Sequence, residues 1–190
     1  MPSRKVPLIN GYYYHIYNRV VENRKLFYSQ NNYISYLKLW KEVDFSPCCR
    51  LITYCLMPTH YHYLVQIINA ELFPKKMSYF FNRYLKSLSN LRKETGRYFD
   101  GRFQAKWVDN EEYLMAVCCY IHLNPIKTNL VASLEQWPYS NYLEFIGRRI
   151  GTLWNRAFFD QYIQSSQNYE RYMASKYTEE GLGPYIFEED

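Results

Sequence analysis

Residues 49–68 restrict the fold of this chain more than any other segment. Cys49–Leu56 and residues 60–68 are two runs rich in aromatic and β-branched side chains, and Met57-Pro58-Thr59 lies between them. Proline cannot donate a backbone hydrogen bond to a sheet, so it belongs at the end of a strand and not inside one. The two runs are therefore predicted to be the strands of a β-hairpin.

Two more strands and two helices are predicted around this hairpin. Residues 12–19 and 102–108 have the aromatic and β-branched composition of strands. Ser29 is a suitable cap for a helix that ends near residue 43. Pro74 is a suitable first residue for a helix that ends near residue 94, since Gly96 follows.

The second half of the chain is predicted to be mainly helical. Asp109 and Glu112 form a capping pair for a helix that should end at Asn124, because Pro125 disfavours helical geometry in the residue before it. One short and one longer helix follow Pro138. The order β-α-β-β-α-β-α predicts an α+β fold. We expect a ferredoxin-like sandwich, with an antiparallel sheet, helices on one face of it, and additional C-terminal helices.

The chain has 190 residues, the size of one domain. We predict a main domain over residues 1–137, a helical extension of it over residues 138–176, and an acidic tail over residues 177–190. No apolar run approaches the roughly 18 residues that a membrane span requires. Five cysteines without a C-x-x-C pair are expected to be reduced core residues, and we expect a cytoplasmic location.

Charge is distributed unevenly along the sequence. Residues 75–106 carry nine basic and two acidic side chains, a net charge of +7, whereas residues 177–190 carry five acidic side chains and no basic one. Aromatic residues are interleaved with the basic ones, a composition suited to single-stranded nucleic acid and equally to a solvated helix face. One hypothesis is that the tail folds over the basic segment and competes with DNA. The alternative is a tail that only keeps the chain solvated.

The pair His60-x-His62 is the sharpest chemical feature. Residues two apart on a strand point to the same face, so two imidazoles would lie side by side. Two imidazoles are half of a divalent metal site. The alternative is two partly exposed strand histidines without a ligand role.

A second feature lies at the end of the helix that Pro125 follows. Tyr120 and Asn124 are one turn apart on the same helix face, and Tyr113 lies two turns before Tyr120. A phenol oxygen can act as a nucleophile and an amide oxygen can bind a hard cation. Core aromatics with a helix-capping asparagine are the alternative. His122 points nearly opposite to Tyr120, so it is not expected to be a catalytic base.

Taken together, these segments resemble the HUH single-tyrosine transposase superfamily, and most closely the REP-associated tyrosine transposases. The matching stretches are YCLMPTHYHYLV (residues 54–65), GRFQAKWV (residues 101–108), residues 113–131 with YIHLNPIKTNLV at their centre, and WPYSNY (residues 137–142). The resemblance extends over about two thirds of the chain. Each motif alone is weak, but their order and separation are specific.

The resemblance implies an activity and a site. It implies that residues 1–137 are a catalytic domain, a metal-dependent single-stranded DNA endonuclease and strand transferase that acts on REP-like hairpins. Tyr120 fits the catalytic tyrosine, which forms a 5′-phosphotyrosine intermediate. His60, His62 and Asn124 fit the ligands of Mg²⁺ or Mn²⁺. The chain is expected to be a monomer whose partner is single-stranded hairpin DNA, with no membrane partner.

Contacts to DNA are expected from basic side chains. On the first predicted strand His15 and Arg19 are expected near the site. The other expected contacts are Arg83, Lys86, Lys93, Arg97, Arg102 and Lys106. A structural zinc module is disfavoured because the nearby cysteines have strand spacing. The main alternative is a hairpin-binding protein that no longer cleaves.

Overall fold

Four strands form one antiparallel sheet in the order β2-β3-β1-β4. The structure is a computed structural model and describes residues 6–176. The strands are β1 (Tyr13–Arg19), β2 (Cys49–Leu56), β3 (His60–Ile67) and β4 (Gln104–Val108). Helices α1 (Gln30–Val43) and α2 (Leu72–Arg92) connect them in the order β1-α1-β2-β3-α2-β4. This order and the antiparallel pairing confirm the predicted ferredoxin-like α+β fold.

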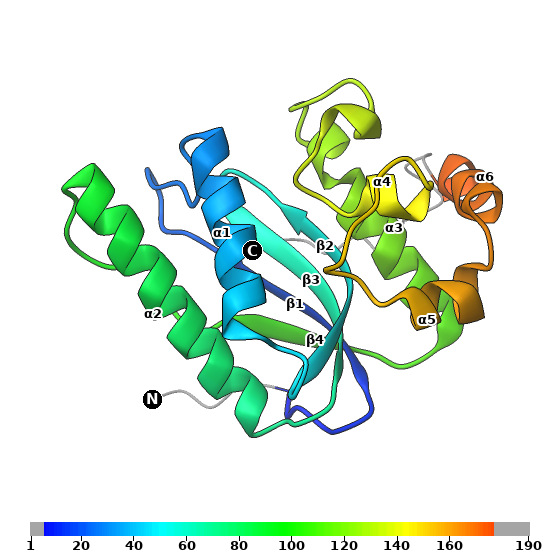
Figure 1. The fold of residues 1–190 in the computed structure, drawn as a ribbon, viewed down its shortest axis with the longest axis horizontal. Coiled ribbons are helices and arrows are strands. Elements are labelled where there is room, and N and C mark those ends of the chain that lie inside the picture. The colour runs from blue at the N-terminus through cyan, green and yellow to red at the C-terminus, as the bar shows by residue number, and fades with distance from the viewer. Residues whose placement is uncertain (1–5, 177–190) are drawn as a thin grey trace.

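Helices cover both faces of the sheet (Figure 1). The first layer, α1 and α2, lies on one face, as predicted. The opposite face is covered by α3 (Glu111–Lys127), with α4 (Tyr142–Phe145), α5 (Arg156–Phe158) and α6 (Ser166–Lys176) beyond it. A 3-10 turn (Leu134–Gln136) and a π-helical turn (Phe159–Ile163) lie between these helices. The expectation of helices on one face of the sheet therefore holds for α1 and α2 only.

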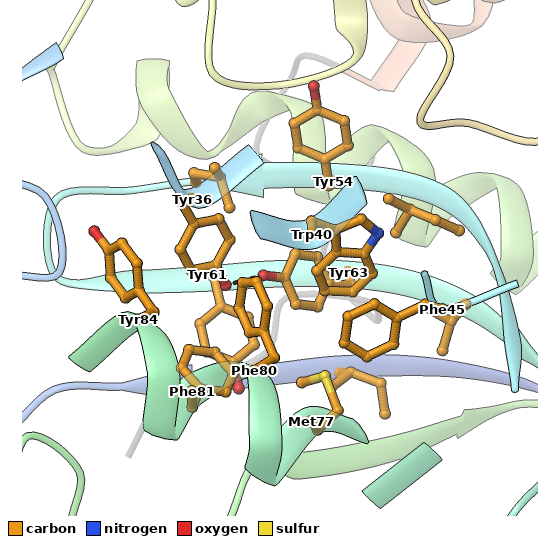
Figure 2. Packing of buried hydrophobic residues seen from close by; sticks show 14 of the residues in the cluster. Tyr36, Trp40, Phe45, Tyr54, Tyr61, Tyr63, Met77, Phe80, Phe81 and Tyr84 are labelled. Atoms are coloured by element: carbon orange, nitrogen blue, oxygen red, sulfur yellow. Dashed lines mark hydrogen bonds between the residues drawn. The ribbon is translucent and has the colours of Figure 1, made fainter. Parts of the chain in front are cut away.

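The sequence of β3 explains why the sheet needs two covers. Strand residues alternate between faces, and nearly every residue of β3 is buried, so neither face of this strand is left to solvent. Tyr61 and Tyr63 enter the aromatic cluster under α1 and α2, where the Tyr63 hydroxyl is hydrogen bonded to that of Tyr36 (Figure 2). Leu64 belongs to the cluster under α3. His60 and His62 share this second face with Leu64.

The predicted starts of two helices are wrong. Helix α2 begins at Leu72 and not at Pro74, because the Asn69 side chain accepts the amide protons of residues 71 and 72. Helix α3 is capped by Asn110 instead of Asp109: the Asn110 side chain accepts the amide proton of Tyr113 at 2.8 Å.

Helix α3 also continues past Pro125 to Lys127. Proline removes only its own amide donor, while the carbonyls of Asn124 and Pro125 still accept the amide protons of Thr128 and Leu130, at 3.1 and 2.9 Å. The missing donor therefore costs one bond in the last turn and does not end the helix.

The segment after Pro138 is bonded to the edge strand β2. The amide of Leu56 donates to the Tyr139 carbonyl, and the Asn141 side chain bonds the backbone of Tyr54 and Ile52 at 2.8 Å each. The division at residue 137 stays a prediction, and the acidic tail, residues 177–190, lies outside the described residues. All five cysteines are free and buried, as expected. Within residues 6–176, no helix has the length and apolar character to span a bilayer.

Candidate active site

The sheet face under α3 carries a row of polar side chains from neighbouring strands. In the antiparallel register His62 is opposite Tyr17, His60 is opposite Arg19, and His15 is opposite both Leu64 and Lys106. Directly opposed residues of antiparallel strands point to the same face. The pairing of β1 with β3 therefore gathers these groups on one surface, although 40 residues of sequence separate the two strands.

His60 and His62 lie side by side, as predicted for a strand. Their ring centroids are 5.0 Å apart and the ring planes are nearly perpendicular, at 84°. Both are buried, with exposed fractions of 5% and 1%. Each Nδ1 has a side-chain partner: Thr59 Oγ1 is 3.0 Å from Nδ1 of His60, and His15 Nε2 is 2.9 Å from Nδ1 of His62.

Tyr120 of α3 packs against His62 and His15. Its ring centroid is 5.7 Å from that of His62 and 5.8 Å from that of His15, in both cases edge to face. The Lys127 ammonium group lies 5.0 Å from the centroid of the same tyrosine ring. A phenol from the helix layer and imidazoles from the sheet therefore meet in one place. Lys127 is seven residues after Tyr120, two helical turns on the same face, so this spacing is visible in the sequence.

Asn124 lies one turn after Tyr120 and is buried. Its side-chain Nδ2 donates to the Tyr120 carbonyl at 2.9 Å, so the amide nitrogen is held against its own helix and Oδ1 is the end that can act as a ligand. Within residues 6–176 no three His, Cys, Asp or Glu side chains are placed to hold a metal ion. A divalent ion bound by His60 and His62 would therefore need an oxygen ligand of another type, and an amide oxygen suits Mg²⁺ and Mn²⁺.

His122 points away from Tyr120, as predicted. It is fully buried between α3 and α6, with Nδ1 2.6 Å from the Tyr169 hydroxyl and Nε2 3.0 Å from Asn141 Oδ1. Burial lowers the pKa of His122 to about 4, the Asn141 hydrogen bond opposes that shift, and the charge of Arg149 adds to it. His122 is thus a neutral structural residue that joins α3 to the C-terminal segment. Tyr113, in the first turn of α3, is packed against the same C-terminal cluster.

The predicted DNA-binding residues lie on different layers of the fold, and their contacts to DNA stay a prediction. A cavity of about 250 Å³ opens beside His60 and His62 and is lined by Arg19 and Arg102. Asp100 also lines it and pairs with Arg97 at 2.8 Å. On β4, Lys106 is in register with His15. These basic residues are therefore near the histidine pair.

The helical basic residues lie elsewhere. Arg83 and Lys86 are on α2, which packs on the opposite face of the sheet, and Arg83 pairs with Glu42 of α1 at 2.7 Å. Lys93 is the left-handed cap residue of α2. The sequence placed these residues with Arg102 because they are close along the chain, but α2 and β4 belong to different layers.

The fold is shared with a solved DNA transposase. No protein-family model and no curated protein matches the sequence. Among solved structures, the chain is similar to a REP-associated tyrosine transposase bound to a REP hairpin, at 15% sequence identity and a TM-score of 0.58. The match covers 82% of this chain and 94% of the transposase chain. The resemblance indicated by the sequence motifs is thus confirmed at the level of structure, and the chain has the fold of a REP-associated tyrosine transposase.

Proposed function

We propose that this protein cleaves and rejoins single-stranded DNA at REP-like hairpins, using Tyr120 as the nucleophile and a divalent metal ion held by His60, His62 and Asn124. The observation that carries the proposal is the meeting of the Tyr120 ring with the His62 ring at 5.7 Å, across the contact between α3 and the sheet. The four motifs of the sequence and the shared fold support the same activity. The solved transposase with this fold was bound to a REP hairpin.

The reaction is an exchange of phosphodiester bonds. The Tyr120 oxygen bonds to the phosphorus, the bond from phosphorus to the DNA 3′-oxygen breaks, and the proton lost by the phenol balances the one gained by the released 3′-hydroxyl. The DNA 5′-phosphate stays on Tyr120, so a second 3′-hydroxyl can reverse the step and join a new strand without a nucleotide cofactor. A Mg²⁺ or Mn²⁺ ion bound by His60, His62 and Asn124 would stabilise the negative charge on the phosphate oxygens.

The surroundings of the histidines suit a phosphodiester. Arg19 and Arg102 line the cavity beside His60 and His62, and guanidinium groups form paired hydrogen bonds to phosphate oxygens. Lys106, in register with His15, adds a third basic group on the same sheet face. We therefore place the DNA backbone across the β1–β4 side of the sheet, with the scissile phosphate at the cavity beside His60 and His62.

The proposal is tested by trapping the intermediate. The protein is incubated with labelled single-stranded REP-type hairpin DNA and Mn²⁺ and then denatured. We expect a covalent protein–DNA adduct in the wild type and in Tyr113→Phe, and none in Tyr120→Phe. Tyr113 is a matched control because it lies on the same helix, two turns before Tyr120. Stable hairpin binding with no adduct under any divalent ion would favour the alternative, a binding protein that does not cleave. A cytoplasmic monomer remains the expected form.

A further inference from the structure

We propose that His15 is a positioning residue for the metal site: its Nε2 accepts the Nδ1 proton of His62, which keeps the lone pair of His62 on Nε2. The inference deepens the proposed function and rests on it, since it assigns a task to a third histidine that the ligand set leaves out. His15 comes from β1, whereas both proposed histidine ligands come from β3.

The contact has the geometry of an in-plane hydrogen bond. His15 Nε2 and His62 Nδ1 are 2.9 Å apart, and both side chains are 1% exposed. The ring planes are within 22° of each other, yet the ring centroids are 5.1 Å apart. The centroids are thus much farther apart than the two nitrogens, as they are when rings lie edge to edge in nearly one plane. The N–H bond and the lone pair of an imidazole also lie in the ring plane, so this arrangement aligns them.

A neutral histidine pair can share this bond in two ways. If His15 donates, His62 Nδ1 accepts, and the proton of neutral His62 must then be on Nε2, where it blocks a metal ion. If His62 donates from Nδ1, its Nε2 carries the lone pair that a metal ion binds, and the proton of His15 is on Nδ1. Only the second arrangement is compatible with His62 as a ligand through Nε2. The partner of one ring nitrogen therefore decides what the other can bind.

His60 has the same arrangement with a different partner. Thr59 Oγ1 is 3.0 Å from Nδ1 of His60, and a hydroxyl oxygen can accept a proton from that nitrogen. Both histidines of the H-x-H pair thus have a side-chain acceptor within reach at Nδ1, which leaves Nε2 as the ligand atom in each. Tyr17 flanks His15 with its ring centroid 4.9 Å away, at 26°, and helps to fix the His15 ring.

The tautomers can be read directly, because the chain has only four histidines. Protonated and unprotonated ring nitrogens are distinguished in long-range ¹⁵N–¹H spectra of histidine-labelled protein without metal. We expect a proton on Nδ1 of His62 and on Nδ1 of His15, with an unprotonated Nε2 in both rings. A proton on Nε2 of His62 in the metal-free protein would overturn the proposal. This measurement needs neither DNA nor cleavage.

Two variants separate positioning from packing. His15→Phe keeps an aromatic ring beside Tyr17 but removes the acceptor, whereas the side-chain oxygen of His15→Gln can accept in place of Nε2. We expect Mn²⁺ to bind about 10- to 100-fold more weakly to the Phe variant, with loss of the Nδ1–H form of His62, and both to be restored in the Gln variant. Equal Mn²⁺ affinity in all three proteins, or equal loss in both variants, would overturn the proposal.

The tests also separate this inference from the proposed function. If wild-type protein has the expected tautomers and binds Mn²⁺ but forms no Tyr120 adduct, the nuclease assignment fails and the role of His15 stands. If the adduct forms and the His62 proton is on Nε2, the role of His15 fails and the nuclease assignment stands. Should the Phe variant not fold, the wild-type spectra and the Gln variant still decide.

Discussion

His122 gives the protein a stability that depends on pH. The ring is fully buried, and its two nitrogens bond Tyr169 and Asn141: in the neutral form the tyrosine hydroxyl donates to Nδ1, and Nε2–H donates to Asn141 Oδ1. Burial lowers the pKa of His122 from an ordinary 6.5 to about 4. The unfolded chain therefore takes up a proton at a pH where the folded chain does not.

The difference between the folded and unfolded pKa of His122 determines in which direction, and by how much, the stability changes with pH. Because the folded pKa is lower than the unfolded one, the stabilising contribution is complete above pH 6.5 and is lost as the pH falls toward about 4. The loss amounts to about 3 kcal/mol, a large part of the stability of an ordinary domain. The two tyrosines whose rings contact His122 do not titrate in this range, since burial raises the pKa of Tyr142 to about 12 and that of Tyr169 well above its ordinary value.

Urea unfolding of the wild type and of His122→Gln, each at pH 7 and at about pH 4, measures this contribution. The carboxylates titrate alike in both proteins, so their effects cancel in the comparison. We expect the wild type to lose about 3 kcal/mol more than the variant between the two pH values. An equal loss in both proteins would refute the argument that His122 is buried in its neutral form.

The remaining predictions concern the metal, the DNA surface and the tail. His60→Ala should abolish adduct formation while hairpin affinity changes little, because phosphate contacts carry most of the affinity; normal cleavage by this variant would contradict the metal assignment. Arg102→Ala, beside the histidine cavity, should reduce the salt dependence of hairpin binding by about 0.7 to 0.9 in log–log slope, whereas Lys86→Ala, on the opposite layer, should not; a larger effect of Lys86→Ala would relocate the DNA. Removal of residues 177–190 should raise hairpin affinity if the tail competes with DNA, and an unchanged affinity and salt dependence would exclude that hypothesis.

The order of elements could be predicted because each rests on a local pattern. The aromatic and β-branched composition of β3, the proline between β2 and β3 and the cap at Ser29 are all visible in short stretches of sequence. The end of α3 could not be predicted in this way. A proline disfavours the helix locally, but hydrogen bonds from residues 128 and 130 keep the last turn intact.

The candidate site was partly predictable, for a different physical reason. His60 and His62 are neighbours on one strand, and Tyr120 and Asn124 on one helix face, so their spacing is local. The role of His15 depends on the register between β1 and β3, two strands that are 40 residues apart in the sequence. A local sequence pattern does not determine that register.

The basic residues are close in the sequence but lie apart in the fold. Lys86 and Arg102 belong to one basic segment of the sequence, but the first lies on α2 and the second beside the cavity on the other face of the sheet. Closeness along the chain therefore does not determine on which layer of the fold a basic residue lies.

The most direct test of the central claim is to identify the amino acid that carries the DNA. The denatured adduct is digested with protease and nuclease, and the modified peptide is sequenced by mass spectrometry. The chain has 22 tyrosines, so the position of the modified tyrosine distinguishes Tyr120 from the others. We predict a nucleotide 5′-phosphate on Tyr120, in the peptide that also contains Asn124. A phosphate on Tyr113 or on any other tyrosine, or a linkage through a DNA 3′-phosphate, would contradict the account.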